Sequence, residues 1–154
     1  MIQVCVLKSN EIDQFMPLWI LQGEYHYALD PIYYKKADSS EEYIEQAILS
    51  DNPHILIAKD NGKIVGFMTM TEGQADYFDT KIEKYGEILE LFVSSEARNK
   101  GIGRLLIAAA EKYFAEKGIK WVKLYCSSFN SGALALYDKI GFIDRQRVLF
   151  KEVK

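Results

Sequence analysis

The sequence predicts an α/β fold with a mixed central sheet, and two patterns support this prediction. Residues 54 to 59 and 63 to 71 are strand-like and flank Asn61-Gly62, a pair suited to the positive backbone angles of a tight hairpin turn. Farther along, a strand over residues 87 to 94 is followed by a helix and by a strand over residues 120 to 126. Hairpins join antiparallel neighbours and helical crossovers join parallel ones, so we expect both kinds of pairing in one sheet.

The first third of the chain supplies one strand and two helices. Residues 2 to 7 alternate as a strand does, and Ser9 or Asn10 offers an N-cap to a helix that Pro17 is expected to bend. The apolar residues of this helix recur at helical spacing: Ile12, Phe15, Met16, Trp19 and Ile20. A second helix runs to about Leu49 and opens with a capping-box pattern, Ser39-Ser40-Glu41-Glu42.

The last third of the chain continues the alternation of helices and strands. A helix with a regular apolar face begins at Ile102 and ends near Gly118, a C-cap glycine. A short helix over residues 130 to 139 is ended by Gly141, and residues 142 to 152 are expected to form one long or two short strands. About four helices should therefore flank the sheet.

Length and composition are those of one soluble globular domain. The chain has 154 residues, of which 49% are hydrophobic and 27% charged, with no apolar run of about eighteen residues. We see no targeting segment before the first strand, so the cytoplasm is the expected location. A formal net charge of -3 argues against nucleic acid as a partner, and Cys5 and Cys126 lack the spacing of a metal-binding pair.

A glycine turn at the start of the third helix is the first functional signal. The sequence Arg98-Asn99-Lys100-Gly101-Ile102-Gly103-Arg104 joins the preceding strand to this helix. The first turn of a helix leaves N–H groups unpaired and carries the positive end of the helix dipole. Glycines let an anion approach the backbone and the cations add donors, so we expect a phosphate-bearing ligand here. A Walker loop would need Gly-Lys-Ser/Thr, and a dinucleotide fingerprint would need glycine in place of Leu106.

Two motifs in this part of the chain have a known counterpart. One is Arg98-x-x-Gly101-x-Gly103, which follows a strand ending in Leu91-Phe92-Val93. The other is Asn130-Ser131-Gly132-Ala133-Leu134-Ala135-Leu136-Tyr137-Asp138-Lys139-Ile140-Gly141-Phe142. They resemble the pyrophosphate loop and the Asn-x-x-Ala-x-x-x-Tyr-x-x-x-Gly-Phe helix of the GNAT superfamily of acetyl-CoA-dependent N-acetyltransferases. The resemblance covers most of residues 54 to 150 and implies a single acetyltransferase domain over residues 1 to 154, with acetyl-CoA as co-substrate.

The resemblance implies where acetyl-CoA binds. In the GNAT fold the fourth and fifth strands splay apart, here residues 87 to 94 and 120 to 126, and the pantetheine arm lies in the gap. Backbone groups of Leu91 and Val93 would pair with the pantetheine amides as an added strand would. The residues expected to bind acetyl-CoA are Leu91, Phe92, Val93, Arg98, Asn99, Lys100, Gly101, Ile102, Gly103, Arg104, Asn130, Ala133 and Tyr137.

The resemblance also implies catalytic roles. Tyr137 stands where the family's tyrosine protonates the coenzyme A sulfur, and a backbone N–H near Phe92 or Val93 would polarise the thioester carbonyl. Glu87 and Glu90 on the central strand are candidates for the base that accepts the amine's proton. Glu87 shares the strand parity of Val93, whereas Glu90 faces the other way unless a bulge intervenes, so Glu87 is preferred.

Aromatic residues and carboxylates in two connections favour a cationic amine as the acceptor. In the family's fold these connections wall the acceptor pocket. They hold Tyr25, Tyr27, Tyr33, Tyr34, Tyr77, Phe78 and Tyr85, with Glu24, Asp30, Asp76 and Asp79 among them. Covering of the core or a dimer contact would explain the same aromatics. His26 and His54 lie outside the matched motifs and are interpreted as surface or satisfied histidines.

The predicted function is acetyl transfer from acetyl-CoA to a primary amine of a small molecule or a peptide. The alternative is a non-catalytic acyl-CoA-binding module that senses the cofactor or regulates a partner, because a fold alone does not define a function. In that case Glu87 and Glu90 would be solvent-exposed charges, and Tyr137 would be an aromatic packed on the sheet. A homodimer is compatible with the sequence, and no metal site, nucleic acid or membrane partner is expected.

Overall fold

The computed structural model describes residues 1–154 and contains a five-stranded sheet with four α-helices. The strands are β1 (Ile2–Val6), β2 (His54–Asp60), β3 (Lys63–Gln74), β4 (Lys84–Val93) and β5 (Val122–Leu124). The helices are α1 (Ile12–Leu29), α2 (Glu41–Ser50), α3 (Ile102–Glu116) and α4 (Ser131–Lys139), with short 3₁₀ turns η1 (Ser9–Glu11) and η2 (Ser95–Ala97). None of these helices combines the length and the hydropathy needed to cross a membrane.

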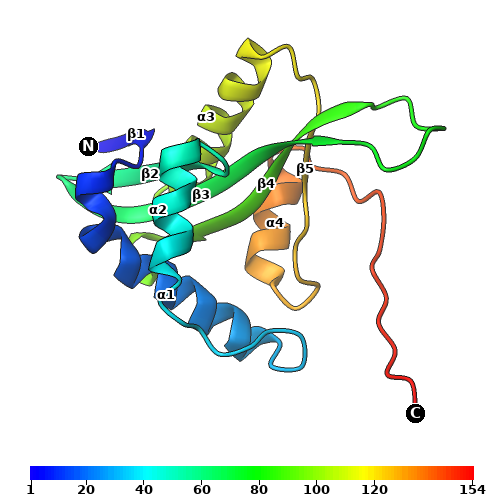
Figure 1. Ribbon diagram of the computed structural model, residues 1–154, viewed down its shortest axis with the longest axis horizontal. Coiled ribbons are helices and arrows are strands. Elements are labelled where there is room, and N and C mark those ends of the chain that lie inside the picture. Colours follow the sequence, from blue (N-terminus) through cyan, green and yellow to red (C-terminus); the bar gives the residue numbers. More distant parts are fainter.

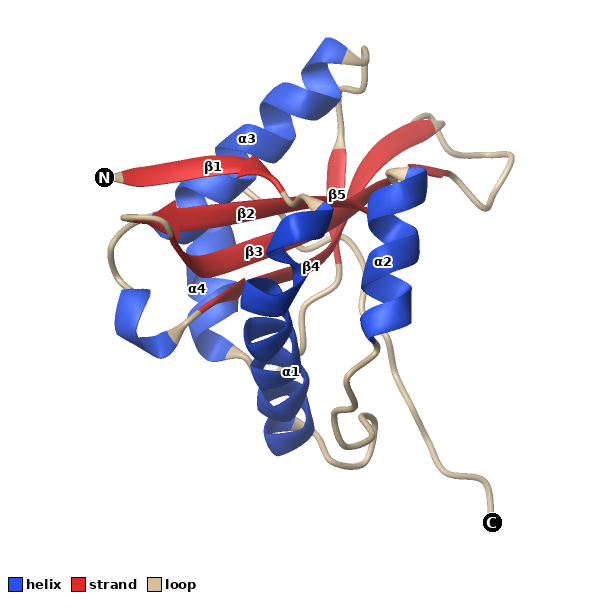
Figure 2. Ribbon diagram, turned by 60° about the vertical axis from the view of Figure 1, so that its left-hand side comes forward, coloured by secondary structure: helices blue, strands red, loops and turns tan.

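The sheet is mixed, as predicted. Its strands lie in the order β1-β2-β3-β4-β5, with antiparallel pairing from β1 to β4 and parallel pairing between β4 and β5. The parallel pair is joined by α3. Helices α1 and α2 cover one face of the sheet, and α3 and α4 lie on the other face (Figure 1, Figure 2).

Each face of the sheet has its own hydrophobic core. Phe67 of β3 is fully buried and packs edge-on against Phe15 of α1, with ring centroids 5.1 Å apart. The next residue, Met68, belongs to the second core with Leu106 and Phe114 of α3. Successive residues of a strand point to opposite faces, so β3 is buried on both sides and forms the centre of the fold.

Local signals were correct at the hairpin turn and wrong at two helix starts. Neither Ser9 nor Asn10 caps α1, because these residues lie in η1 and the N-cap of α1 is Glu11. Asn61 and Gly62 have φ angles of 48° and 85°, which confirms the tight turn between β2 and β3. The capping box predicted for α2 is wrong, because Ser40 makes no side-chain cap bond and its hydroxyl donates instead to Asp38. Pro17 lies inside α1, which continues without interruption to Leu29.

The strands predicted over residues 142 to 152 are absent. Residues 142–154 belong to no helix or strand, and β5 is shorter than predicted at both ends. A strand requires a neighbour to accept its backbone hydrogen bonds, and this segment has none within the chain. The segment leaves α4 and extends away from the sheet (Figure 1).

Candidate functional site

A β-bulge in β4 decides which side chains share a face. Thr69 of β3 pairs with Glu90 and Met70 pairs with Ile88, so Leu89 has no partner on β3. An extra residue shifts the alternation of all residues beyond it. Consequently Leu91 and Val93 pack with the α3-side core, as Ile88 does, while Phe92 belongs to the α1-side core.

The bulge corrects the parity argument that favoured Glu87. Gly86 and Ile88 face α3, so Glu87 between them faces the α1 side. Beyond the bulge, Glu90 also faces the α1 side, where it contacts Gln22. Glu87 and Glu90 therefore lie on the same face, and Glu87 does not share the face of Val93.

The gap between β4 and β5 opens just beyond the bulge. The two strands pair only from Gly86 with Val122 to Ile88 with Leu124. Beyond Ile88, β4 continues to Val93 paired with β3 but not with β5. This is the predicted separation of the fourth and fifth strands. The separation leaves one edge of the C-terminal half of β4 without a partner strand.

The backbone groups on that edge can be identified from the β3 ladder. Ser94 N donates to Val65 O at 2.9 Å, and these residues flank the pair Gly66 and Val93. Gly66 and Val93 are therefore a non-hydrogen-bonded pair of the antiparallel ladder, and the backbone N–H and C=O groups of Val93 point away from β3. The groups of Val93 and, two residues earlier, of Leu91 therefore point into the gap. Those of Phe92 point toward β3 instead.

The start of α3 offers a second set of free donors. Its first backbone hydrogen bond runs from Leu105 N to Gly101 O at 3.1 Å, so the N–H groups of Ile102, Gly103 and Arg104 have no backbone partner. Asn99 and Gly101 have φ angles of 62° and 77°, which turn the chain sharply into the helix. An added Cβ at Gly101 would meet no atom within 4 Å, whereas one at Gly103 would come within 3.0 Å of Leu136 in α4. The helix start thus combines open space with unpaired N–H groups, as anion binding requires.

The three cations of the loop are placed differently from one another. Arg98 reaches back to β4, where its Nε donates to Val93 O at 3.1 Å and its guanidinium lies 5.2 Å from the ring centroid of Tyr25. Lys100 and Arg104 are exposed and make no ion pair. They remain available to a ligand at the helix start.

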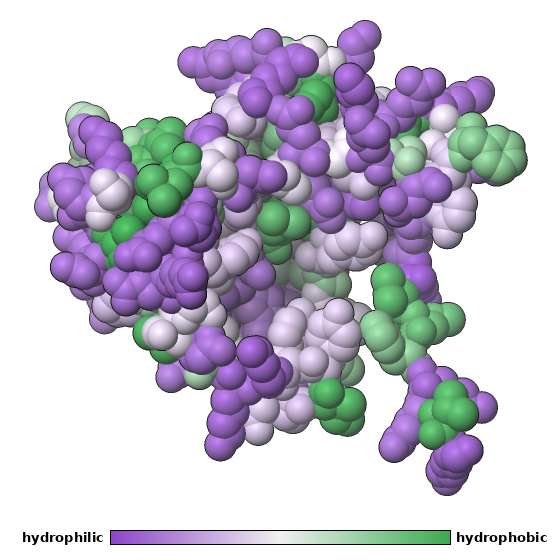
Figure 3. Space-filling view, in the orientation of Figure 1, coloured by the Kyte–Doolittle hydropathy of each residue, from purple (hydrophilic) through white to green (hydrophobic).

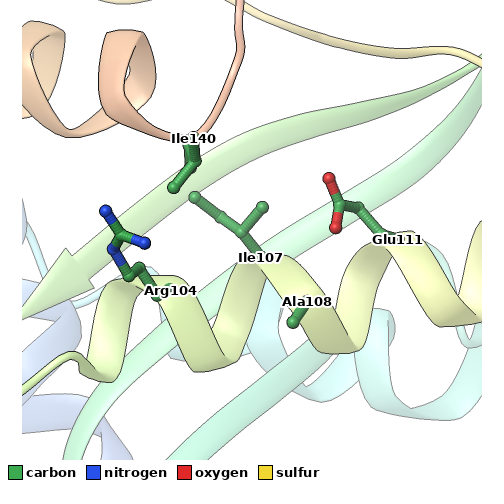
Figure 4. Close-up of a pocket in the computed structure, with 5 residues that line it drawn as sticks. All are labelled: Arg104, Ile107, Ala108, Glu111 and Ile140. Atoms are coloured by element: carbon green, nitrogen blue, oxygen red, sulfur yellow. The ribbon is translucent and has the colours of Figure 1, made fainter.

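Arg104 also borders a shallow hollow between α3 and α4. Figure 4 shows Arg104 and Ile107 extending from α3 toward Ile140, and the hollow is completed by Ala108 and Glu111. Its lining comes from α3 and from Ile140 at the end of α4, and includes no residue of β4 or β5.

Glu90 lies at the centre of a polar cluster on the α1 side of the sheet. Its side chain is 33% exposed, accepts a hydrogen bond from Gln22 Nε2, and lies 3.5 Å from His26 Nε2. The other ring nitrogen of His26, Nδ1, is buried and has no hydrogen-bond partner. The ring of Tyr34 packs against His26 with centroids 4.9 Å apart, and burial together with the charge of Glu90 raises the pKa of Tyr34.

Glu87 has a different environment. Its carboxylate forms an ion pair with Lys123 of β5 at 3.9 Å. Lys123 also donates to the hydroxyl of Tyr85 at 3.1 Å. The Glu87 carboxylate is thus engaged by a lysine, whereas Glu90 contacts no Lys or Arg. Of the two glutamates, Glu90 is therefore better suited to act as a base.

Tyr137 is half-buried on α4 and packs edge-on against Phe142, with ring centroids 5.6 Å apart. Burial raises the pKa of Tyr137, and the negative charge that Glu90 or Cys126 carries when it is ionised raises it further. The influence of Glu90 on both Tyr137 and Tyr34 shows that one carboxylate acts on groups from α4 and from the loop after α1.

Asn130 and Ala133 form the start of α4. Asn130 Oδ1 accepts a hydrogen bond from Ala133 N at 3.2 Å, so Asn130 is the N-cap of the helix. The same oxygen accepts from the hydroxyl of Tyr25 at 3.4 Å. This contact links α1 and α4 on either side of the gap.

Only part of the expected aromatic wall gathers near Glu90. Tyr25, Tyr33 and Tyr34 belong to the end of α1 and its following loop, and Tyr33 packs on Tyr34 with centroids 4.9 Å apart. Tyr77 and Phe78 instead lie at the tip of the β3–β4 connection, where both are exposed, far from that loop (Figure 1). The second connection therefore does not wall this site.

Sequence reasoning missed Gln22 and set His26 aside. Gln22 is buried on the apolar face of α1, seven residues after Phe15 and four before His26. A buried amide at that helical spacing is a detectable signal, because buried polar groups require partners.

The family model for acetyltransferases of the GNAT family matches residues 18–142. An uncharacterised N-acetyltransferase of Methanocaldococcus jannaschii is 28% identical over 140 residues; the match covers 91% of this chain and only 60% of that protein's length. A mutant of the Bacillus halodurans protein BH1408 has the same fold, with a TM-score of 0.88, 18% identity and 99% of both chains covered. The aminoglycoside N-acetyltransferase AAC(6')-Iy, solved in complex with coenzyme A, gives a TM-score of 0.78 at 18% identity, with 100% of this chain and 95% of that chain covered.

The match to the family model includes both the loop at the start of α3 and the helix motif that ends at Phe142. The mixed sheet, the separated β4 and β5 and the free N–H groups at the start of α3 are consistent with that match. The chain belongs to the GNAT family of acetyltransferases.

Proposed function

We propose that this acetyltransferase moves the acetyl group of acetyl-CoA to a primary amine that is cationic in solution. The observation that carries the proposal is Glu90, a carboxylate that contacts no Lys or Arg and lies on β4 where the strand has a free edge, near enough to Tyr137 to raise the pKa of its hydroxyl. A proton acceptor and a proton donor beside one gap are what acetyl transfer between an amine and a thioester requires.

The diphosphate of acetyl-CoA would bind at the start of α3. Free N–H groups of Ile102, Gly103 and Arg104 can donate to phosphate oxygens, and Lys100 adds a mobile cation. The pantetheine would extend along the free edge of β4, where the N–H and C=O groups of Leu91 and the C=O group of Val93 can pair with its amides. Asn130 and Ala133 would border the pantetheine from the start of α4. Asn130 would act indirectly, because its side chain caps the helix and so fixes where α4 begins.

Glu90 is our choice for the general base. The amine's proton would pass to Glu90, directly or through one water, and the amine nitrogen would then form the new bond to the acetyl carbon. Glu87 would act mainly by holding Lys123, which ties β4 to β5 where they are still paired. His26 would hold Glu90 in position from α1.

Two further groups complete the transfer. Val93 N–H points into the gap and would donate to the thioester oxygen, whereas Phe92 N–H is turned toward β3. As the carbon–sulfur bond breaks, Tyr137 would give its proton to the departing thiolate. The pKa of Tyr137 lies above its ordinary value of about 10, so the hydroxyl stays protonated at neutral pH. The burial that raises the pKa of the phenol also raises that of a thiol in the same place, which limits the cost of the transfer.

The acceptor would approach from the loop after α1. Tyr33 and Tyr34 offer aromatic faces beside Glu90, and a cation is attracted both to such faces and to the carboxylate. We therefore expect cationic amines to be preferred over alcohols and acidic peptides, with acceptor binding weakened by salt. An aminoglycoside belongs in the test panel because AAC(6')-Iy, a protein of the same fold, is named for that substrate. The cytoplasmic location stays a prediction.

The decisive experiment measures release of free thiol from acetyl-CoA across polyamines, aminoglycosides, amino acids and N-terminal peptides. The proposal expects turnover with at least one cationic amine and an acetylated product by mass spectrometry. Tight acetyl-CoA binding without turnover on any acceptor would instead favour the alternative, a non-catalytic acyl-CoA sensor. Best turnover on an uncharged or anionic acceptor would contradict the assignment of the acceptor.

A further inference from the structure

Gln22 is one of only three polar side chains that are buried in this chain, with 4% of its surface exposed. Hydrophilic side chains mostly lie on the outside, as the wide purple areas of the face shown in Figure 3 illustrate. The other buried residues of α1 are all apolar: Ile12, Phe15, Met16 and Leu18. Burying an amide costs free energy unless its polar atoms are paired, so packing of α1 against the sheet does not explain a glutamine at this position.

The partner of the buried amide is Glu90. Nε2 of Gln22 donates a hydrogen bond to Oε2 of Glu90, which lies 68 positions later in the chain. Gln22 needs this bond because it is buried, whereas the side chain of Glu90 is 33% exposed and can be hydrated by water. An apolar residue at position 22 with a hydrated Glu90 would therefore serve the fold as well. What the hydrogen bond adds is a fixed orientation of the carboxylate.

The two carboxylate oxygens of Glu90 have different surroundings. Oε2 accepts from Gln22 and also lies 3.5 Å from Nε2 of His26, which follows Gln22 by one turn of α1. Oε1 has no hydrogen-bond or ion-pair partner within the chain. Of the two α1 side chains, Gln22 is the stronger anchor, because it forms a hydrogen bond and is almost fully buried, whereas the side chain of His26 is 24% exposed.

We propose that Gln22 is a positioning residue for the general base: its amide holds Oε2 of Glu90, so that Oε1 is presented to the acceptor amine. A glutamate side chain rotates about several bonds, and a base takes a proton only from within hydrogen-bond reach. Anchoring one oxygen removes most of this freedom before the acceptor arrives, which places the other oxygen for the proton transfer. The inference rests on the proposed role of Glu90 and assigns to Gln22 no contact with the substrate.

The test replaces Gln22 by Met, which has a similar length but no hydrogen-bond donor. We expect Gln22→Met to lower kcat by about 10- to 100-fold and to leave the KM for acetyl-CoA unchanged, because only the base is displaced. Its melting temperature should stay equal or rise, because a buried amide gives way to an apolar side chain. The matched control is Leu18→Met, one turn earlier on α1 and also buried, which should keep kcat within about two-fold of the original value.

A double-mutant cycle separates positioning from a general effect on the fold. In the Glu90→Gln protein the base is absent, so adding Gln22→Met should change kcat by less than about two-fold. An equal loss of kcat in both backgrounds would overturn the inference, and so would a melting temperature of Gln22→Met well below that of Leu18→Met. Full activity in Gln22→Met beside a deficit in Glu90→Gln would overturn this inference alone. Full activity in Glu90→Gln would overturn both the proposed base and its positioning by Gln22.

Discussion

Replacing Glu90 by Gln tests the assignment of the general base. Glutamine keeps the size of the side chain and can still accept the hydrogen bond from Gln22, so the fold should change little. Because one-third of this side chain is exposed, we expect a stability loss below about 1 kcal/mol. Loss of a general base lowers kcat by about 10²- to 10⁴-fold, which corresponds to about 3 to 5 kcal/mol in the barrier.

The matched control is Glu87→Gln on the same strand and the same face. Glu87 is held by Lys123, so its loss should leave kcat within a few-fold of the original value. Raising the pH should also shrink the deficit of Glu90→Gln, because solvent then supplies amine that has already lost its proton. Steady-state thiol release at several pH values measures both effects. The reasoning is refuted if Glu87→Gln costs more activity than Glu90→Gln, or if the deficit does not depend on pH.

Three further predictions concern the donor tyrosine, the phosphate loop and the sheet. Tyr137→Phe should lower kcat by about 10²- to 10⁴-fold, whereas calorimetry should show unchanged affinity for acetyl-CoA. In the unmodified enzyme kcat should not fall between pH 8 and about 10, because burial raises the pKa of the Tyr137 hydroxyl. Full activity in the variant would mean that Tyr137 only packs. Gly103→Val should abolish the stabilisation of about 2.7 kcal/mol expected from acetyl-CoA at about a hundred times its dissociation constant, and an unchanged shift in the thermal melt would remove the loop assignment. Gly86→Ala should destabilise the fold by about 1 to 3 kcal/mol in urea titrations, because its Cβ would lie 2.4 Å from the ring of Phe114; a neutral effect would mean that α3 and β4 separate easily.

Features controlled by neighbouring residues could be predicted from the sequence. The turn at Asn61-Gly62 and the entry into α3 at Gly101 depend on positive φ angles, which few residue types adopt. The presence of Asn and Gly therefore predicts both features. The N-cap at Asn130 is of the same kind, since a side chain three residues away supplies the bond.

Features controlled by residues far away in the sequence could not be predicted. The bulge at Leu89 exists only in the register of β4 against β3, and it reversed the choice between two glutamates. The bond between Gln22 and Glu90 joins residues 68 positions apart, beyond the reach of any local pattern. Residues 142 to 152 have the composition of strands, but a strand also needs a neighbour, which the chain does not supply for them.

Amide hydrogen exchange with and without acetyl-CoA tests the central claim most directly, because it reports on the individual donors that the site would use. Without ligand, the N–H groups of Leu91, Val93 and Gly103 have no backbone partner and should exchange quickly. Acetyl-CoA should slow these three amides and leave Phe92, already paired with β3, unchanged. Protection confined to the hollow between α3 and α4, with Leu91 and Val93 still exchanging quickly, would contradict the account.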